Sequence, residues 1–169
     1  MPNWCENDLY VRGSKEELEK FKEAVRGTGH DGEEKLICED KIIPYPENFR
    51  LLDVAAEEYR QKYPIGFKIP PKDGFNQGGR EWCLENWGTK WGFVEVELVV
   101  ESDDELQYTF RTAWSPPNPL IRKLGEMFPN LEFEFRYFEG GMGFNGILSI
   151  KEGQAVDDRT GEYFGSRGG

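Results

Sequence analysis

Three cysteines and a single histidine are the side chains best suited to metal chemistry in this chain of 169 residues. Structural zinc sites use ligand pairs about two to four residues apart, and an iron–sulfur cluster needs one cysteine more than the chain has. Cys5, Cys38 and Cys83 are widely spaced, and His30 lies alone in a glycine-rich segment. The sequence therefore predicts no metal site and no cofactor, and we expect the cysteines to be small, buried apolar side chains.

Nucleophilic catalysis has equally little support in the sequence. A nearby cation can lower the pKa of a thiol, and Lys90 could do this for Cys5 or Cys83 in the fold. The chain has no Gly-x-Ser-x-Gly motif and no second base near a cysteine. Gly140, Gly141 and Gly143 lack the lysine of a phosphate-binding loop and predict a turn. No catalytic residue is assigned, and the pattern favours a protein that is not an enzyme without settling the question.

Aromatic and polar side chains are densest between positions 82 and 91. The members of this block are Trp82, Asn86, Trp87, Thr89, Lys90 and Trp91, and Trp4 and Trp114 are candidates to join them. Ligand pockets combine aromatic walls with a few polar groups, and tryptophan often dominates protein interfaces. Three alternatives stay open: the tryptophans seal an insertion onto a sheet as a second small core, they form a site for a ligand or a partner, or they are simply exposed at the surface.

The first half of the chain predicts the elements that lead to this block. Alternating apolar residues over 7–12 indicate a half-buried strand. Ser14 and Glu17 form a capping box for a helix that ends at Gly27. Residues 35–43 indicate a further strand, and an apolar stripe predicts a helix over about 47–62; this stripe consists of Leu51, Leu52, Ala55, Ala56 and Tyr59. Proline and glycine predict a loop over 64–80, and its mobility is left open.

The second half predicts a hairpin, a helix and two further strands. Residues 94–100 and 106–112 alternate on either side of a turn at 102–104. Asn118 is the expected N-cap of a helix that has Pro119 at its first position. Strands are predicted over 131–137 and near 144–151, and residues 154–169 are expected to form a tail that frays or lies on the surface.

This order of elements predicts an α+β protein with a ferredoxin-like βαββαβ sandwich. Both helices are expected on one face of a single antiparallel sheet. An insertion over about 30–92 follows the first helix, and an extra C-terminal strand follows the last strand of the βαββαβ pattern. We expect one domain over residues 1–153.

Five short motifs resemble a known family. They are Pro2-Asn3-Trp4-Cys5-x-Asn7, Ile43-Pro44-x-Pro46, Asn86-Trp87-Gly88-Thr89-Lys90-Trp91, Phe110-x-Thr112-Ala113-Trp114-Ser115-Pro116-Pro117 and Tyr137-x-Glu139-x-Gly141. Over about residues 2–150, the set resembles the YubB-type ferredoxin-like domain family of phage, plasmid and bacterial proteins. The resemblance implies the fold already indicated and an association with phages or plasmids, and it implies no activity or site residue.

The charge of the chain argues against nucleic-acid binding. The formal net charge is −11, which predicts repulsion from phosphate backbones. Sheet-type RNA-binding domains present basic and aromatic side chains on the open face. The positions expected there carry more acidic than basic side chains: Asp8, Tyr10, Arg12, Glu95, Glu97, Gln107, Thr109, Arg111, Glu132, Glu134 and Arg136. We expect arginine–glutamate pairs across these strands and no direct nucleic-acid binding.

The sequence also predicts a cytoplasmic protein with no membrane partner. Its longest apolar runs, such as 98–100, have only three residues, far below the roughly 20 residues that span a bilayer. Residues 1–6 lack the basic and apolar regions of a signal peptide. Three widely spaced cysteines fit a reducing compartment.

The tryptophans and the missing catalytic set favour a non-enzymatic accessory domain that docks a protein partner through its insertion. An alternative is a small-ligand binder or enzyme that uses the same pocket, with Lys90 contacting an anion and Asn86 and Thr89 orienting the ligand. A further alternative is an acidic mimic of nucleic acid that occupies a basic groove of an enzyme. The sequence leaves the partner and the oligomeric state open.

Overall fold

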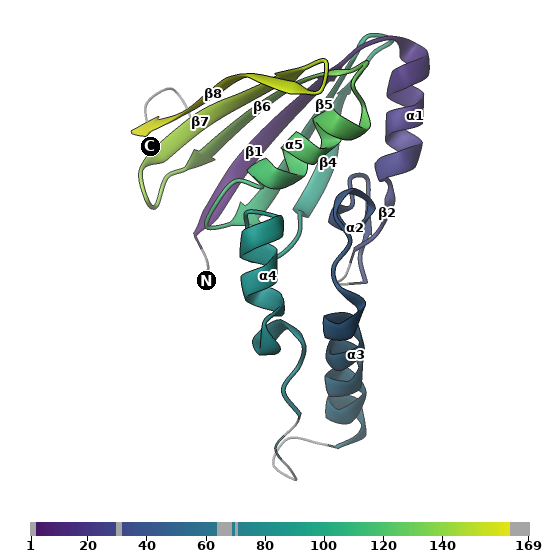
Figure 1. Cartoon of the computed structure of the whole chain (residues 1–169), viewed down its shortest axis with the longest axis vertical. Coiled ribbons are helices and arrows are strands. Elements are labelled where there is room, and N and C mark those ends of the chain that lie inside the picture. Colours follow the sequence, from purple (N-terminus) through teal and green to yellow (C-terminus); the bar gives the residue numbers. More distant parts are fainter. Residues whose placement is uncertain (1–2, 30–31, 64–68, 70, 163–169) are drawn as a thin grey trace.

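The structure is a computed structural model that describes residues 3–29, 32–63, 69 and 71–162. Its main body is a six-stranded antiparallel sheet in the order β4-β5-β1-β6-β7-β8. The strands are β1 (Trp4–Arg12), β4 (Val94–Glu101), β5 (Glu105–Ala113), β6 (Glu132–Glu139), β7 (Phe144–Lys151) and β8 (Gln154–Glu162). Helices α1 (Lys15–Val25) and α5 (Asn118–Met127) cover one face of the sheet (Figure 1). The predicted α+β, ferredoxin-like fold is therefore confirmed.

The core lies between this sheet and the two helices. Alternate residues of β1, β5 and β6 are buried because successive side chains of a strand point to opposite faces. Apolar residues of α1 and α5 meet them, and Phe21 of α1 packs its ring against Tyr108, Phe128 and Phe133. The predicted cap of α1 is present, since the Ser14 side chain accepts a hydrogen bond from the Glu17 amide at 3.3 Å. The opposite face of the sheet has no helix over it in Figure 1.

The insertion between α1 and β4 contains most of the remaining elements. They are β2 (Gly27–Thr28), β3 (Glu34–Lys35), α2 (Glu39–Ile42), α3 (Glu47–Lys62), a 3-10 helix η1 (Phe75–Gln77) and α4 (Gly79–Asn86). Figure 1 shows α3 and the segment before α4 extending beyond the end of the sheet. We call this extension, residues 47–63 and 71–86, the arm.

Two predictions for the insertion were wrong in detail. The strand expected over 35–43 is limited to the short β3, and α2 follows it. A short apolar run cannot by itself distinguish a strand from a helix. The loop expected over 64–80 contains η1 and the first turn of α4, and part of it (64–68 and 70) lies outside the described residues.

The C-terminal segment also differs from expectation. Residues 154–162 form β8, which pairs with β7 over its whole length, whereas a surface tail was predicted from residue 154. Nearly all side chains of β8 are exposed, so the strand carries no apolar alternation that the sequence could reveal. Main-chain hydrogen bonding to β7 fixes it instead. Residues 163–169 of the predicted tail lie outside the described residues.

The start of α5 lies one residue earlier than predicted. Pro117 occupies the N-cap, and Asn118 is the first helical residue. The Asn118 Oδ1 atom is buried without a hydrogen-bond partner, so the side chain does not cap the helix. In the part of the chain that is described, no helix has the length and apolar character needed to cross a membrane.

Candidate interaction site at the end of the sheet

The structure separates the predicted tryptophan block into an internal group and a surface group. Trp87 is fully buried, and its indole nitrogen donates a hydrogen bond to the Ile43 carbonyl at 2.8 Å. The Trp82 ring packs edge-on against Trp87 with 5.4 Å between centroids. The ring centroid of Tyr45 lies 5.8 Å from the ring centroids of both Trp82 and Trp87, and Tyr45 is itself buried. Trp87 is therefore part of the buried core, and Trp82 is half-buried and packs against it.

Two predicted polar site residues serve the main chain. The Asn86 side-chain amide donates to the Trp82 carbonyl at 2.9 Å, within the same helix. The Thr89 hydroxyl is buried and donates to the Ala113 carbonyl at 3.0 Å. The sequence suggested, as an alternative, that Asn86 and Thr89 orient a ligand. In the structure both side chains donate to main-chain carbonyls instead. Thr89 instead anchors the end of the insertion to the end of β5.

Gly88 allows this close junction between the insertion and α5. Its φ angle is +79°, in the left-handed region that favours glycine. A Cβ atom there would lie 2.6 Å from Cδ of Pro119, at the start of α5. The Ser115 hydroxyl donates to the Gly88 carbonyl at 2.6 Å. The insertion is thus held against the chain that follows β5, and this contact positions the surface tryptophans.

The surface group consists of Trp4, Lys90, Trp91 and Trp114, and we call it the tryptophan patch. Trp4 and Trp91 pack edge-on with 6.3 Å between ring centroids. The Lys90 amine lies 4.9 Å from the Trp91 ring centroid, within cation–π distance. Trp114 is 42% exposed, and Trp4, Lys90 and Trp91 are half-buried. Three distant segments therefore contribute aromatic side chains to one end of the sheet.

Trp114 has a main-chain conformation that large side chains rarely adopt. Its φ angle is +71°, in the left-handed region. Its amide donates to the Asn3 carbonyl at 3.0 Å, and the Thr112 hydroxyl donates to the Ser115 carbonyl at 2.8 Å. These bonds hold the kink that follows β5. Such conformations cost free energy and are found more often at functional sites than elsewhere.

A polar pocket lies on the open face beside the tryptophan patch. It has a volume of about 180 Å³ and is lined by Glu6, Asn7, Glu95, Glu97, Thr109, Phe110 and Arg111. Trp4 and Glu6 are two residues apart in β1, so their side chains share this face. Arg111 pairs with Glu95 at 3.1 Å, and Glu95 has a φ angle of +53° where the β4–β5 register shifts. The pocket is polar and carries more carboxylates than cations.

A larger pocket lies between β4 and the β2–β3 hairpin. Its volume is about 430 Å³, and its lining residues are Arg26, Glu33, Glu34, Lys35, Leu36, Phe93, Val94, Glu95 and Val96. Lys35 forms a buried ion pair with Glu39 at 2.8 Å, and the two side chains are 6% and 0% exposed. The second carboxylate oxygen of Glu39 accepts from the Phe93 amide at 3.3 Å. This pair joins the insertion to the start of β4.

The three cysteines are buried apart from one another and hold their protons strongly. Burial is the main cause that raises the pKa of the Cys5 and Cys83 thiols to about 12. Burial also raises the pKa of Cys38. These shifts are opposite to those of a reactive thiolate. Among the described residues, no group of three or more potential metal ligands is present, and His30 lies outside them.

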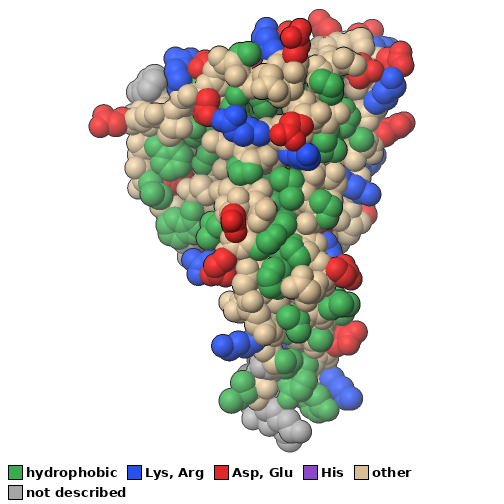
Figure 2. Space-filling model, viewed as in Figure 1, with side chains coloured by type: hydrophobic (Ala, Val, Ile, Leu, Met, Phe, Trp, Pro, Cys, Tyr) green, Lys and Arg blue, Asp and Glu red, His purple; other side chains and the backbone are tan. Residues whose placement is uncertain are grey.

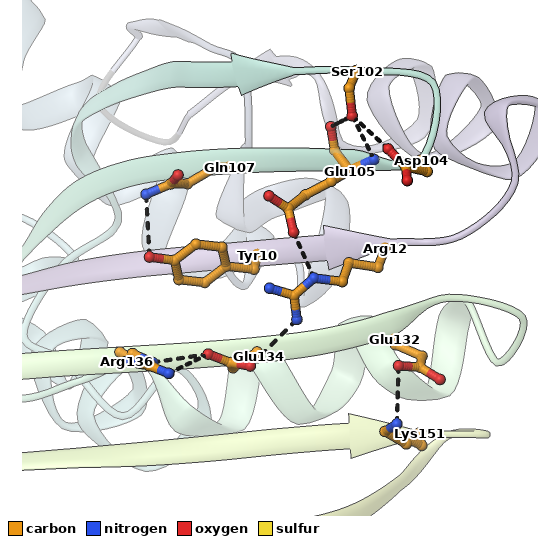
Figure 3. Close-up of polar contacts among 10 residues, drawn as sticks. All are labelled: Tyr10, Arg12, Ser102, Asp104, Glu105, Gln107, Glu132, Glu134, Arg136 and Lys151. Carbon is orange, nitrogen blue, oxygen red and sulfur yellow. Dashed lines mark hydrogen bonds and ion pairs between the residues drawn. The ribbon is translucent and has the colours of Figure 1, made fainter.

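Ion pairs connect the strands on the open face, as the alternation predicts (Figure 3). Arg12 lies between two neighbouring strands and contacts Glu105 at 2.5 Å and Glu134 at 3.3 Å. Two further pairs join neighbouring strands, Arg111–Glu95 and Lys151–Glu132, whereas Arg136–Glu134 and Arg159–Asp157 each lie within one strand. Each arginine or lysine named here thus lies beside at least one carboxylate.

Some residues that shape these sites were not identified from the sequence. Tyr45 completes the internal aromatic group. The feature of the sequence that could have identified it is its position between Pro44 and Pro46, just before α3. Lys35 ends β3 and Glu39 begins α2, so their ion pair spans a connection that the sequence did not reveal, because the whole segment was assigned to one strand. Their burial could not be read from the sequence because charged side chains are normally exposed.

Comparison with known proteins supports the fold and part of the family resemblance. The family model described as the ferredoxin-like domain in Api92-like protein matches residues 87–166. The crystal structure of a protein api92 from Yersinia pseudotuberculosis is similar, with a TM-score of 0.61 and 12% sequence identity, over 98% of this chain and 99% of that chain. No curated protein matches the chain. Both comparisons name Api92-like proteins, and neither names the YubB-type family that the sequence motifs resemble. At 12% identity the structural likeness shows the fold alone.

Proposed function

We propose that this protein is a non-enzymatic accessory domain that docks a protein partner through the tryptophan patch. The observation that carries the proposal is the convergence of Trp4, Trp91 and Trp114 from three distant segments at the surface, with Trp114 42% exposed. Tryptophan is strongly enriched among the residues that dominate binding energy at protein interfaces. The proposed docking surface does not include Trp82 and Trp87, which pack against each other and against Tyr45.

The polar pocket beside the patch gives this surface the composition of an interface. Interfaces combine an aromatic centre with a polar rim. Arg111, Glu95 and Glu6 supply charged groups next to Trp4. Because carboxylates outnumber cations there, we expect the partner to present basic or amide groups around an apolar contact.

The test compares binding by patch variants with binding by a matched surface variant. Trp91→Ser/Trp114→Ser removes two rings of the patch, and Met142→Ser removes a side chain that is 63% exposed in the turn before β7. We expect a protein captured from cell extract by the wild type and by Met142→Ser to be lost from the patch variant. Circular dichroism and thermal unfolding must show that all three proteins fold.

Purified partner then decides between the proposed class and its alternatives. Binding that weakens at least tenfold (about 1.4 kcal/mol) in the patch variant supports docking. Equal binding by the patch variant and Met142→Ser contradicts it. A third outcome is binding to a basic enzyme that is lost when salt is added and is unchanged by the patch substitutions. That outcome would favour the acidic mimic of nucleic acid.

A further inference from the structure

The apolar stripe of α3 faces solvent instead of the protein core. Leu51 and Leu52 are 60% and 40% exposed, Ala55 is exposed, and Tyr59 is half-buried. Of the predicted stripe, only Ala56 is buried. An amphipathic helix normally buries its apolar stripe, and a contiguous exposed one indicates an interaction site. Figure 2 shows apolar side chains along the narrow arm, away from the charged end of the body.

Polar contacts hold α3 to the rest of the arm through a different face. The Asp53 carboxylate accepts from the Phe75 amide at 2.9 Å, and Arg60 pairs with Asp73 at 2.9 Å. Gly74 lies so close to Phe49 that a Cβ atom on it would be 2.1 Å from the Phe49 carbonyl oxygen. Because these contacts use Phe49, Asp53 and Arg60, the stripe with Leu51, Leu52, Ala55 and Tyr59 stays open.

The stripe is symmetric about a small residue. Ala55 lies at its centre, with Leu51 and Leu52 one turn towards the N-terminus and Tyr59 one turn towards the C-terminus. A small side chain at the centre lets two helices approach closely, and larger ones on both sides fill the space around the crossing. A helix of 16 residues extends about 24 Å, which is long enough for such a contact.

We propose that this stripe binds a second copy of the chain, with two α3 helices antiparallel across a two-fold axis at Ala55. In that arrangement Leu51 and Leu52 of one copy meet the Tyr59 turn of the other. The interface is self-complementary and closes as a dimer. It is separate from the tryptophan patch and does not depend on the function proposed for that patch.

The charges of α3 favour the antiparallel direction and a second copy of itself. Glu47 lies in the first turn and Lys62 in the last, so antiparallel packing brings opposite charges together at both ends. Among the described residues, Lys62 has no carboxylate at ion-pair distance, and its amine lies 5.6 Å from the Tyr63 ring. The helix has nearly equal numbers of acidic and basic residues, whereas the chain carries −11. Two copies can therefore approach here with little of the repulsion expected elsewhere.

The size of the stripe predicts a weak dimer. Stable interfaces bury about 800 Å² on each partner, and one helix face supplies less than that. We expect the dissociation constant to lie in a range of about 10–100 μM. Sedimentation velocity over a concentration series should show the full-length chain passing from monomer to dimer in that range.

Cysteine cross-linking tests the geometry because all three native cysteines are buried. Ala55→Cys places a thiol at the two-fold axis, where two copies can form a disulfide. Val54→Cys is the matched control, since Val54 is the next residue, is 51% exposed and points about 100° away around the helix. Under mild oxidation near the dissociation constant, we expect dimers to form about tenfold faster with Ala55→Cys than with Val54→Cys.

Two further variants separate this dimer from other occupants of the stripe. Leu51→Gln should abolish dimerisation while leaving thermal unfolding unchanged, because Leu51 is mostly exposed. Lys62→Glu should weaken the dimer, and Glu47→Lys/Lys62→Glu should restore it only if the helices are antiparallel. A monomer at every concentration, equal cross-linking rates for the two cysteine variants, or a Leu51→Gln chain that still dimerises would each overturn the proposal. A monomeric wild type that binds another protein through Leu51 would show a different occupant.

Discussion

The interior of the insertion and the open face of the sheet use the same residue types in opposite surroundings. Each contains tryptophans and each contains ion pairs. In the insertion, Trp87 and the Lys35–Glu39 pair are almost fully removed from solvent. On the open face, Trp4 and the Arg12 pairs are partly exposed. The comparison shows that surroundings, and not residue type, determine whether such a side chain stabilises the fold or is available to a partner.

Electrostatics makes this difference large. A buried charge has lost its hydration, so removing its partner leaves an uncompensated ion in a medium of low dielectric constant. An exposed ion pair competes with water and salt and contributes little. The following substitutions therefore test whether the insertion interior is structural and the open face dispensable for folding, and they are ordered from the largest expected effect to the smallest.

Trp87→Ala should cause the largest loss of stability. The substitution leaves a cavity beside Trp82 and Tyr45 and removes the hydrogen bond to the Ile43 carbonyl. We expect the free energy of unfolding to fall by about 4 kcal/mol, as for other large aromatic residues in cores. Urea unfolding followed by circular dichroism measures it. A loss below about 1 kcal/mol would mean that the internal tryptophans are not a second core.

Lys35→Met should destabilise the protein by about 3 kcal/mol, because it leaves the Glu39 carboxylate buried without its cation. Lys35→Met/Glu39→Gln should recover much of the loss, since the double variant has no unpaired buried charge. The two single variants, the double variant and the wild type form a double-mutant cycle in urea. Strictly additive losses would show that the two charges do not interact and would remove the contrast with the open face.

The fold of the body could be derived from the sequence, and the reason is periodicity. β1, β5 and β6 each have one buried and one exposed face, so their side chains alternate visibly. α1 has Ser14 as its N-cap and a regular apolar stripe. β8 has neither signal, because it lies at the sheet edge with nearly all its side chains exposed, and its pairing with β7 comes from main-chain bonds.

The candidate site could be predicted only as a set of residues. Composition identified Trp4, Trp82, Trp87, Trp91 and Trp114, but not which of them are internal. That division depends on the path of the insertion, which brings Trp87 against the Ile43 carbonyl and leaves Trp91 beside Trp4. The α3 stripe was recognised from the sequence, and its exposure was not, because an amphipathic pattern does not reveal whether the covering surface belongs to the same chain.

Alkaline pH should destabilise the insertion interior through Cys83. Burial raises the pKa of this thiol from 9.0 to about 12. Below pH 9 the Cys83 thiol is protonated in both the folded and the unfolded state, so its full contribution to the free energy of unfolding is present. Above pH 9 the unfolded thiol ionises first, so stability falls as the pH rises towards 12. Between pH 9 and pH 11 we expect the wild type to lose about 1–2 kcal/mol more than Cys83→Ala. Parallel pH profiles of the two proteins would contradict this.

Arg12→Ala should have the smallest effect on stability, although Arg12 contacts two carboxylates. Its side chain is 42% exposed, so water and salt screen both contacts. We expect a loss of about 0.5–1 kcal/mol that shrinks further in high salt. Arg159→Ala is the control, because Arg159 is 75% exposed and pairs only with Asp157 among the described residues, so its substitution should leave stability unchanged within error. If Arg12→Ala instead cost as much as Lys35→Met, the open face would be part of the structural core, and the distinction drawn between the two regions would fail.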